Sequence, residues 1–160
     1  MVLGLPIETF TTLHVILSLI GIAAGVIVVF GMLGGNRLDG LTAIFLATTI
    51  LTNITGFLFP FGGVTPGVII GVVSTVVLAV ALLARYVFDL HGSWIYVLTA
   101  AAALYLNAFV GVVQAFQKQP LLQPLAPTQS EPPFVIAQGV VLLIAIVLGG
   151  LAVRRFHPQS

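Results

Sequence analysis

The chain has 160 residues, of which 59% are hydrophobic and only 6% are charged, with a formal net charge of +1 and no cysteine. Soluble domains carry about 25% charged residues, so this composition excludes a soluble globular fold and predicts a chain that resides in a lipid bilayer. The low net charge excludes the basic surface that nucleic acid binding needs. The lack of cysteine excludes disulfides and thiolate metal sites.

Five long apolar segments follow one another along the chain. Each is close to the roughly 20 residues that a helix needs to cross a hydrocarbon core of about 30 Å. The segments are 11–34, 41–59, 68–88, 94–116 and 135–153. The sequence therefore predicts an all-α, single-domain bundle of five transmembrane helices over residues 1–160. The residues before the first segment lack Lys and Arg, so we expect a retained helix and not a signal peptide.

Positively charged residues are divided unequally between the two sides of this bundle. Lys118 lies alone on one side, and the other side, which carries the C-terminus, holds Arg37, Arg85, Arg154 and Arg155. The positive-inside rule then places the N-terminus outside and the C-terminus in the cytoplasm. The short connections predict that consecutive helices are antiparallel neighbours.

The outer loop over residues 117–134 is unusually rich in proline, with five prolines. Such density disfavours regular helix and favours extended or polyproline geometry. The loop is either a passive crossover or a semi-rigid cap over the outer mouth of the bundle. We expect it to be ordered against the bundle, with Leu121, Leu122 and Leu125 as apolar anchors.

Each predicted span carries a stripe of small and polar residues at helical spacing. Small residues let helix backbones approach closely in a membrane, and polar residues form hydrogen bonds between helices. The stripes are His14, Ser18, Gly21 and Gly25; Thr49, Thr52, Asn53 and Gly56; Gly67, Gly71, Ser74, Leu78, Ala81 and Arg85; Asn107, Gly111, Gln114 and Lys118; and Gln138, Ala145, Gly149 and Ala152. The opposite face of the fourth helix, with Tyr105, Phe109, Val112 and Phe116, is expected to face lipid.

Polar residues of four helices are expected in the outer half of the membrane, which predicts a ligand-binding pocket there. Its residues are His14, Asn53, Asn107, Gln114 and Gln138, with Lys118 at the rim. The leading hypothesis is a non-catalytic membrane protein that binds a small molecule or lipid headgroup or assists transport, as a homo-oligomer or within a larger membrane complex. Hydrogen bonding between helices is the alternative role of the same residues.

Little in the sequence indicates catalysis. The three histidines do not form a metal-binding cluster, and no acidic residue lies in the middle of a span, which argues against a carboxylate-based proton pump. The alternative function is a quinone- or haem-binding subunit of a membrane redox enzyme that uses His14. No particular cofactor is indicated.

A second cluster is expected at the inner interface, where Arg85 and Asp89 are i, i+4 partners and charged side chains extend toward water. Arg37, Asp39 and His91 lie in the neighbouring loops. Together with an aromatic belt of Tyr86, Trp94 and Tyr96, these residues are expected to anchor the bundle in the membrane.

Two phrases carry a resemblance to other proteins. LTNITGFLFPF (51–61) and LYLNAFVGVVQAFQKQPLLQPLAPTQSEPPF (104–134) resemble segments of small bacterial polytopic inner-membrane proteins without an assigned activity. The resemblance implies a multi-pass protein of the bacterial inner membrane and indicates no substrate.

Overall fold

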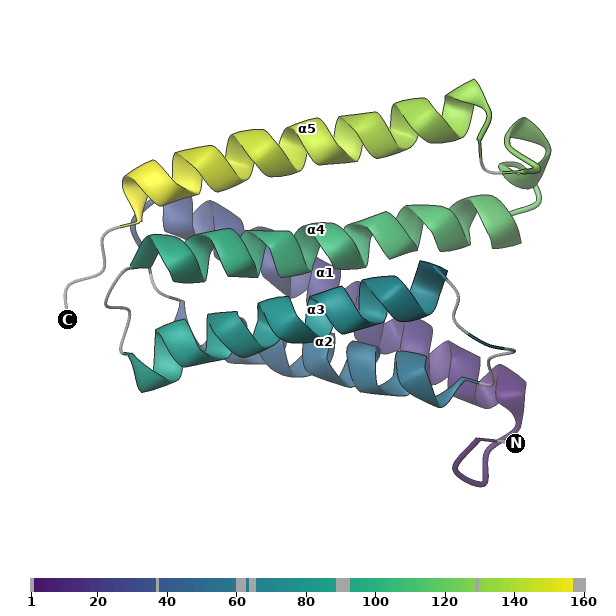
Figure 1. The fold of residues 1–160 in the computed structure, drawn as a ribbon, viewed down its shortest axis with the longest axis horizontal. Helices are drawn as coiled ribbons and strands as arrows, with labels where there is room; N and C mark the ends of the chain where they lie inside the picture. Colours follow the sequence, from purple (N-terminus) through teal and green to yellow (C-terminus); the bar gives the residue numbers. More distant parts are fainter. Residues whose placement is uncertain are drawn as a thin grey trace.

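The computed structural model of the chain is an all-helical bundle (Figure 1). It describes residues 2–36, 38–59, 63, 66–88, 93–128 and 130–156, with the backbone alone described for 66, 67, 93, 117 and 118. Within this part, the α-helices are α1 (Ile7–Leu33), α2 (Asp39–Leu58), α3 (Pro66–Leu82), α4 (Ser93–Lys118) and α5 (Pro132–Arg155). A π-helical turn, η1 (Leu83–Val87), continues α3, and a short 3₁₀ turn, η2 (Gln123–Leu125), lies between α4 and α5.

Five helical segments of this described part are long and apolar enough to cross a membrane. This confirms the predicted all-α chain with five helices of spanning length. We call the end of the bundle where α1 begins and η2 lies the N-terminal end. The end where α2 begins and η1 lies is the C-terminal end, and α5 finishes there (Figure 1).

Helix α4 is the central element of the bundle, because it packs against α1, α2, α3 and α5. Consecutive helices contact one another, as the short connections predicted. Helix α1 lies along α2 and also meets α4 and α5. The seam at which α1, α2 and α4 meet is therefore enclosed by three helices.

Several residues of the predicted stripes are buried in the interior of the bundle. The buried residues of α5 are Gln138, Gly149 and Ala152, all members of its stripe. At Gly25 of α1, an added Cβ would lie 2.8 Å from both the Phe45 ring and the Leu104 side chain. Glycine is thus required for the close approach of α1 to its neighbours, as small residues at helix contacts allow.

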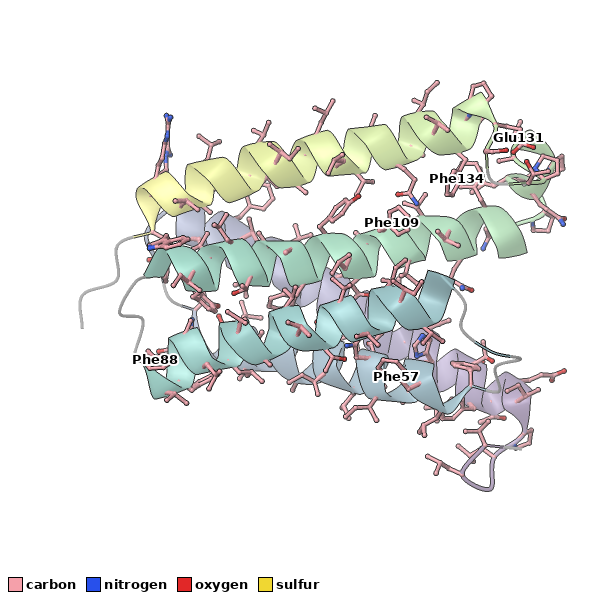
Figure 2. The ribbon with its side chains drawn as sticks, in the orientation of Figure 1. Phe57, Phe88, Phe109, Glu131 and Phe134 are labelled. Atoms are coloured by element: carbon pink, nitrogen blue, oxygen red, sulfur yellow. The ribbon has the colours of Figure 1, made fainter. Side chains whose placement is uncertain are left out.

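The aromatic face of α4 does not face lipid, which corrects the expectation above. Phe116 is buried and packs edge-to-face on Phe134 of α5, with ring centroids 5.5 Å apart. Figure 2 shows Phe109 in the space between α4 and α5. The expectation was wrong because α5 returns along this face, and no pattern within α4 alone records that return.

The proline-rich loop is more helical than its composition suggested. Pro132 and Pro133 lie in the first turn of α5. Proline is tolerated there because the backbone N–H groups of a first helical turn have no partner within the helix. The loop also places Ala126, and not the predicted leucines, in a buried position. Leu121 is 88% exposed and Leu125 is 51% exposed, so neither is an anchor, whereas the third predicted leucine, Leu122, is half-buried.

Candidate functional site

A set of polar side chains follows the contact between α1, α2 and α4. We call it the polar seam. It consists of His14, Ser18 and Gly21 of α1, Thr48, Thr49 and Thr55 of α2, and Asn107 of α4. His14 is the only one of these side chains that carries an ionisable group.

The centre of the polar seam is a hydrogen bond between α1 and α4. The Ser18 hydroxyl donates to Asn107 Oδ1 at 2.8 Å, and Asn107 Nδ2 lies 3.5 Å from the Ser18 carbonyl oxygen. Asn107 is buried, and both residues lie near the midpoints of their helices. For helices that cross a bilayer, this places an amide group close to the midplane, where polar groups are rare and indicate function.

Gly21 has no side chain, and polar atoms of α2 and α4 therefore lie close to its backbone. A Cβ built there would lie 3.1 Å from Thr49 Oγ1 and 3.2 Å from both Thr48 Oγ1 and Asn107 Nδ2. The Thr48 hydroxyl donates to the Ile44 carbonyl at 2.6 Å, and the Thr49 hydroxyl donates to the Phe45 carbonyl at 2.6 Å. Since each threonine hydrogen is used in this way, both oxygens offer acceptor lone pairs next to Gly21.

His14 occupies the seam toward the N-terminal end. Its Nδ1 lies 2.7 Å from Thr55 Oγ1, and its ring meets the edge of Phe59 with centroids 5.2 Å apart. The Thr55 hydroxyl donates to the Leu51 carbonyl at 2.7 Å, so we assign the hydrogen of the histidine contact to Nδ1. Phe10 packs on Phe59 with centroids 5.0 Å apart and covers this end of the seam.

The seam stops toward the C-terminal end. Phe45 is fully buried and fills the space beside Gly25, one turn below Gly21. Beyond it lies an apolar core that includes Val28, Met32 and Leu78. The polar groups therefore extend from the bundle centre toward the N-terminal end.

The other predicted site residues lie at different helix contacts. Asn53 faces α3, where its Nδ2 lies 3.0 Å from Thr75 Oγ1 and 3.3 Å from the Gly71 carbonyl oxygen. Gln138 Nε2 donates to the Phe109 carbonyl at 3.2 Å. Gln114 is half-buried on α4, and the side chain of Lys118 lies outside the described residues. The structure thus brings His14 and Asn107 to one seam, and Asn53 and Gln138 to two others.

The cluster at the C-terminal end also differs from expectation. Arg85 is buried and forms an ion pair with Asp39 at the start of α2. Tyr96, expected in an interfacial belt, is fully buried, and its ring lies 5.1 Å from the Arg85 guanidinium carbon. Tyr96 belongs to the buried core that also contains Ala81 and Ala100. Arg37, Asp89 and His91 lie outside the described residues.

Sequence reasoning missed the threonines of the seam. Thr48 and Thr55 were not assigned to any site, and Ser18 was assigned only to packing. The signal was present in the density of hydroxyl and amide residues from Thr48 to Thr55, since threonines bonded to their own helix keep acceptor lone pairs for neighbours.

Within the described part of the chain, no group of three His, Cys, Asp or Glu side chains is placed to hold a metal ion. Comparison of the chain with protein-family models, curated proteins and solved structures finds no significant match.

Proposed function

We propose that the chain is a non-catalytic, multi-pass membrane protein whose polar seam binds a small molecule or a lipid headgroup, either as a receptor or as part of a transport step. One observation carries the proposal. Thr48, Thr49 and Asn107 bring polar atoms from α2 and α4 to within 3.1–3.2 Å of the position that a Cβ would take on Gly21, near the middle of α1. Polar side chains are rare in a membrane interior and are associated with function there, so their convergence from two helices on a third supports a ligand site.

The chemistry of the seam favours an uncharged ligand with hydrogen-bond donors. Thr48 and Thr49 offer acceptor oxygens, and Asn107 adds an amide donor. Carboxylate, ammonium and guanidinium groups are absent from the set of seam residues, and an ion in a low-dielectric site needs a compensating charge. Hydroxyl or amide compounds and uncharged parts of a headgroup meet these requirements.

Direction and location belong to the same proposal. The arginine distribution supports a cytoplasmic C-terminal end, so the seam would face the outside. We place the protein in the bacterial inner membrane on the resemblance described above. Association into a homo-oligomer or a larger membrane complex is compatible with the apolar outer faces of α3 and α5.

The test uses a glycine substitution that fills the seam without adding a polar group. Gly21→Ala would bring a methyl group within 3.1–3.2 Å of three polar atoms, whereas the control Gly111→Ala meets Ile22 at an ordinary 3.6 Å. Native mass spectrometry of the purified protein should detect a bound small molecule or lipid in the unchanged chain and in the control. We expect Gly21→Ala to lose it. Equal retention in all three proteins would contradict the proposal.

A second candidate function rests on His14. Its ring is held by Thr55 and Phe59 in a single orientation, as a haem ligand or a quinone-binding histidine requires. An absorption spectrum and an organic extract of the same preparation separate the candidates. A Soret band or extracted quinone that is lost in His14→Ala supports a redox subunit, and a colourless, quinone-free protein that retains another ligand supports the first function.

A further inference from the structure

Two layers of side chains separate the polar seam from the C-terminal end of the bundle. Phe45 forms the first layer. The second contains Arg85 of η1, which pairs with Asp39 and lies against Tyr96 of α4. Thr42, one turn after Asp39 on α2, is fully buried beside Tyr96.

The two charged groups of the second layer differ in their exposure to water. The Arg85 side chain is 2% exposed, whereas the side chain of its partner Asp39 is 72% exposed. The guanidinium carbon also lies 5.8 Å from the ring centroid of Tyr86, so cation–π interactions with aromatic rings stabilise the buried arginine. Because water reaches the carboxylate, separating this pair costs far less than separating a fully buried pair.

Each partner of the ion pair lies in or directly beside irregular backbone. Arg85 is at the centre of the π-helical turn η1, which the Phe88 N–H closes on the Leu83 carbonyl at 2.9 Å. Asp39 directly follows Leu38, a non-glycine residue in the left-handed region with φ 45°. Single π-helical turns occur frequently at functional sites, and left-handed residues of this kind cost energy that their surroundings must offset.

The π-helical turn also provides a way for the arginine to move. It contains one residue more per turn than an α-helix, so conversion to α geometry rotates the side chains that follow it. A long arginine near a helix end can extend its charged group toward the aqueous interface. Its departure would leave Thr42 and Tyr96 as the next residues exposed to water entering from the C-terminal end.

We propose that the Arg85–Asp39 pair is a latch that closes the C-terminal end of the bundle over Thr42 and Tyr96, and that the π-helical turn allows it to open. An open latch admits water toward Phe45 and the polar seam. The latch adds to the proposed transport role of the seam and rests on that role, because the seam is the place that water would reach. The opening of the latch itself is measured without any ligand.

The chain contains no cysteine, so a single introduced cysteine reports access directly. Ala100 is fully buried on the face of α4 that runs from Tyr96 toward Asn107. Ala100→Cys is labelled with a membrane-impermeant maleimide from each side of oriented vesicles, with and without Asp39→Asn. We expect Asp39→Asn to raise labelling from the C-terminal side roughly two- to fivefold, the range that loss of a half-exposed ion pair allows.

Two controls keep the result specific. Glu8→Gln removes one carboxylate charge at the other end of the bundle and should leave the labelling of Ala100→Cys unchanged. Leu125→Cys, in the exposed η2 turn, should react equally in both backgrounds and only from the N-terminal side, which shows that both proteins are inserted in the same orientation.

Two results would overturn the latch. If Asp39→Asn does not change the labelling of Ala100→Cys, the ion pair is a structural contact that does not control access. If labelling increases equally from both sides, the substitution has loosened the whole bundle. Equal retention of the ligand by Gly21→Ala, or no bound ligand in the unchanged chain, would instead refute the function of the seam and leave the labelling result intact.

Discussion

The Ser18 hydroxyl donates to Asn107 Oδ1 at 2.8 Å and joins the middle of α1 to the middle of α4. These residues are 89 positions apart in the chain. The contact ties the first helix to the central one at the level where Gly21 admits the polar atoms of α2. The strength of this contact therefore tests the geometry on which the seam depends.

Ser18→Ala and Asn107→Ala should interact in a double-mutant cycle, because each removes one partner of the same hydrogen bond. We expect a coupling free energy of about 0.6–1.7 kcal/mol, the range for hydrogen bonds between membrane helices. Unfolding in mixed micelles measures it. The pair Ser18→Ala and Thr99→Ala is the control and should be additive within about 0.5 kcal/mol. Additivity of the first pair would show that the two side chains do not interact.

Gln138 combines one hydrogen bond with one unmet acceptor. Its Nε2 bonds to the Phe109 carbonyl, while its buried Oε1 has no hydrogen-bond partner among the described residues. A buried acceptor of this kind costs about 1–3 kcal/mol. Gln138→Met keeps the volume and removes the acceptor, so we expect a thermal stability equal to or higher than that of the unchanged protein. A loss of more than about 1 kcal/mol would show that the bond to Phe109 outweighs the unmet oxygen.

Glu131 at the start of α5 predicts a pH-dependent loop. Its carboxylate accepts hydrogen bonds from the Thr128 hydroxyl at 2.7 Å and from the Thr128 and Ser130 N–H groups at 3.1 Å. The Thr128 hydroxyl bond is the main cause that lowers the pKa of Glu131. A lowered folded-state pKa means that the stabilisation is present at neutral pH and is lost as the pH falls from the ordinary value, about 4.3, through the folded-state value.

A spin label at Leu121→Cys, an 88% exposed position, reads out this loop. We expect its mobility to increase as the sample is acidified below about pH 4.3. Glu131→Gln should show the increased mobility already at pH 7, and Glu8→Gln should behave as the unchanged chain. A label whose mobility is independent of both pH and Glu131 would contradict the prediction.

Membrane orientation is tested by reporter fusions after Ser160. The excess of arginine at the C-terminal end predicts that a cytoplasmic fluorescent reporter is active and that a phosphatase requiring export is inactive. Fusions in the α4–α5 loop should give the reverse pattern. An active exported phosphatase at the C-terminus would turn the polar seam toward the cytoplasm and reverse the side from which the latch opens.

The sequence by itself determined the five helices and one buried face of several of them, although it missed the second packed face of α4. Both are local properties, since hydropathy over about 20 residues and spacing along one helix suffice to recognise them. The burial of Gly21 and Gly25, and of Gln138 and Ala152, followed from spacing alone. The amide and imidazole side chains of the candidate site were found in the same way.

Only the tertiary structure decided which stripe meets which. Asn53 turned toward α3 and Gln138 toward α4, so these two predicted pocket residues lie at separate contacts. Arg85 bonds to Asp39, 46 positions away in the chain, and no spacing within one helix could have indicated this contact. A stripe specifies the face that a helix buries, but its partner is selected by the shape and position of the other helices, which no single segment encodes.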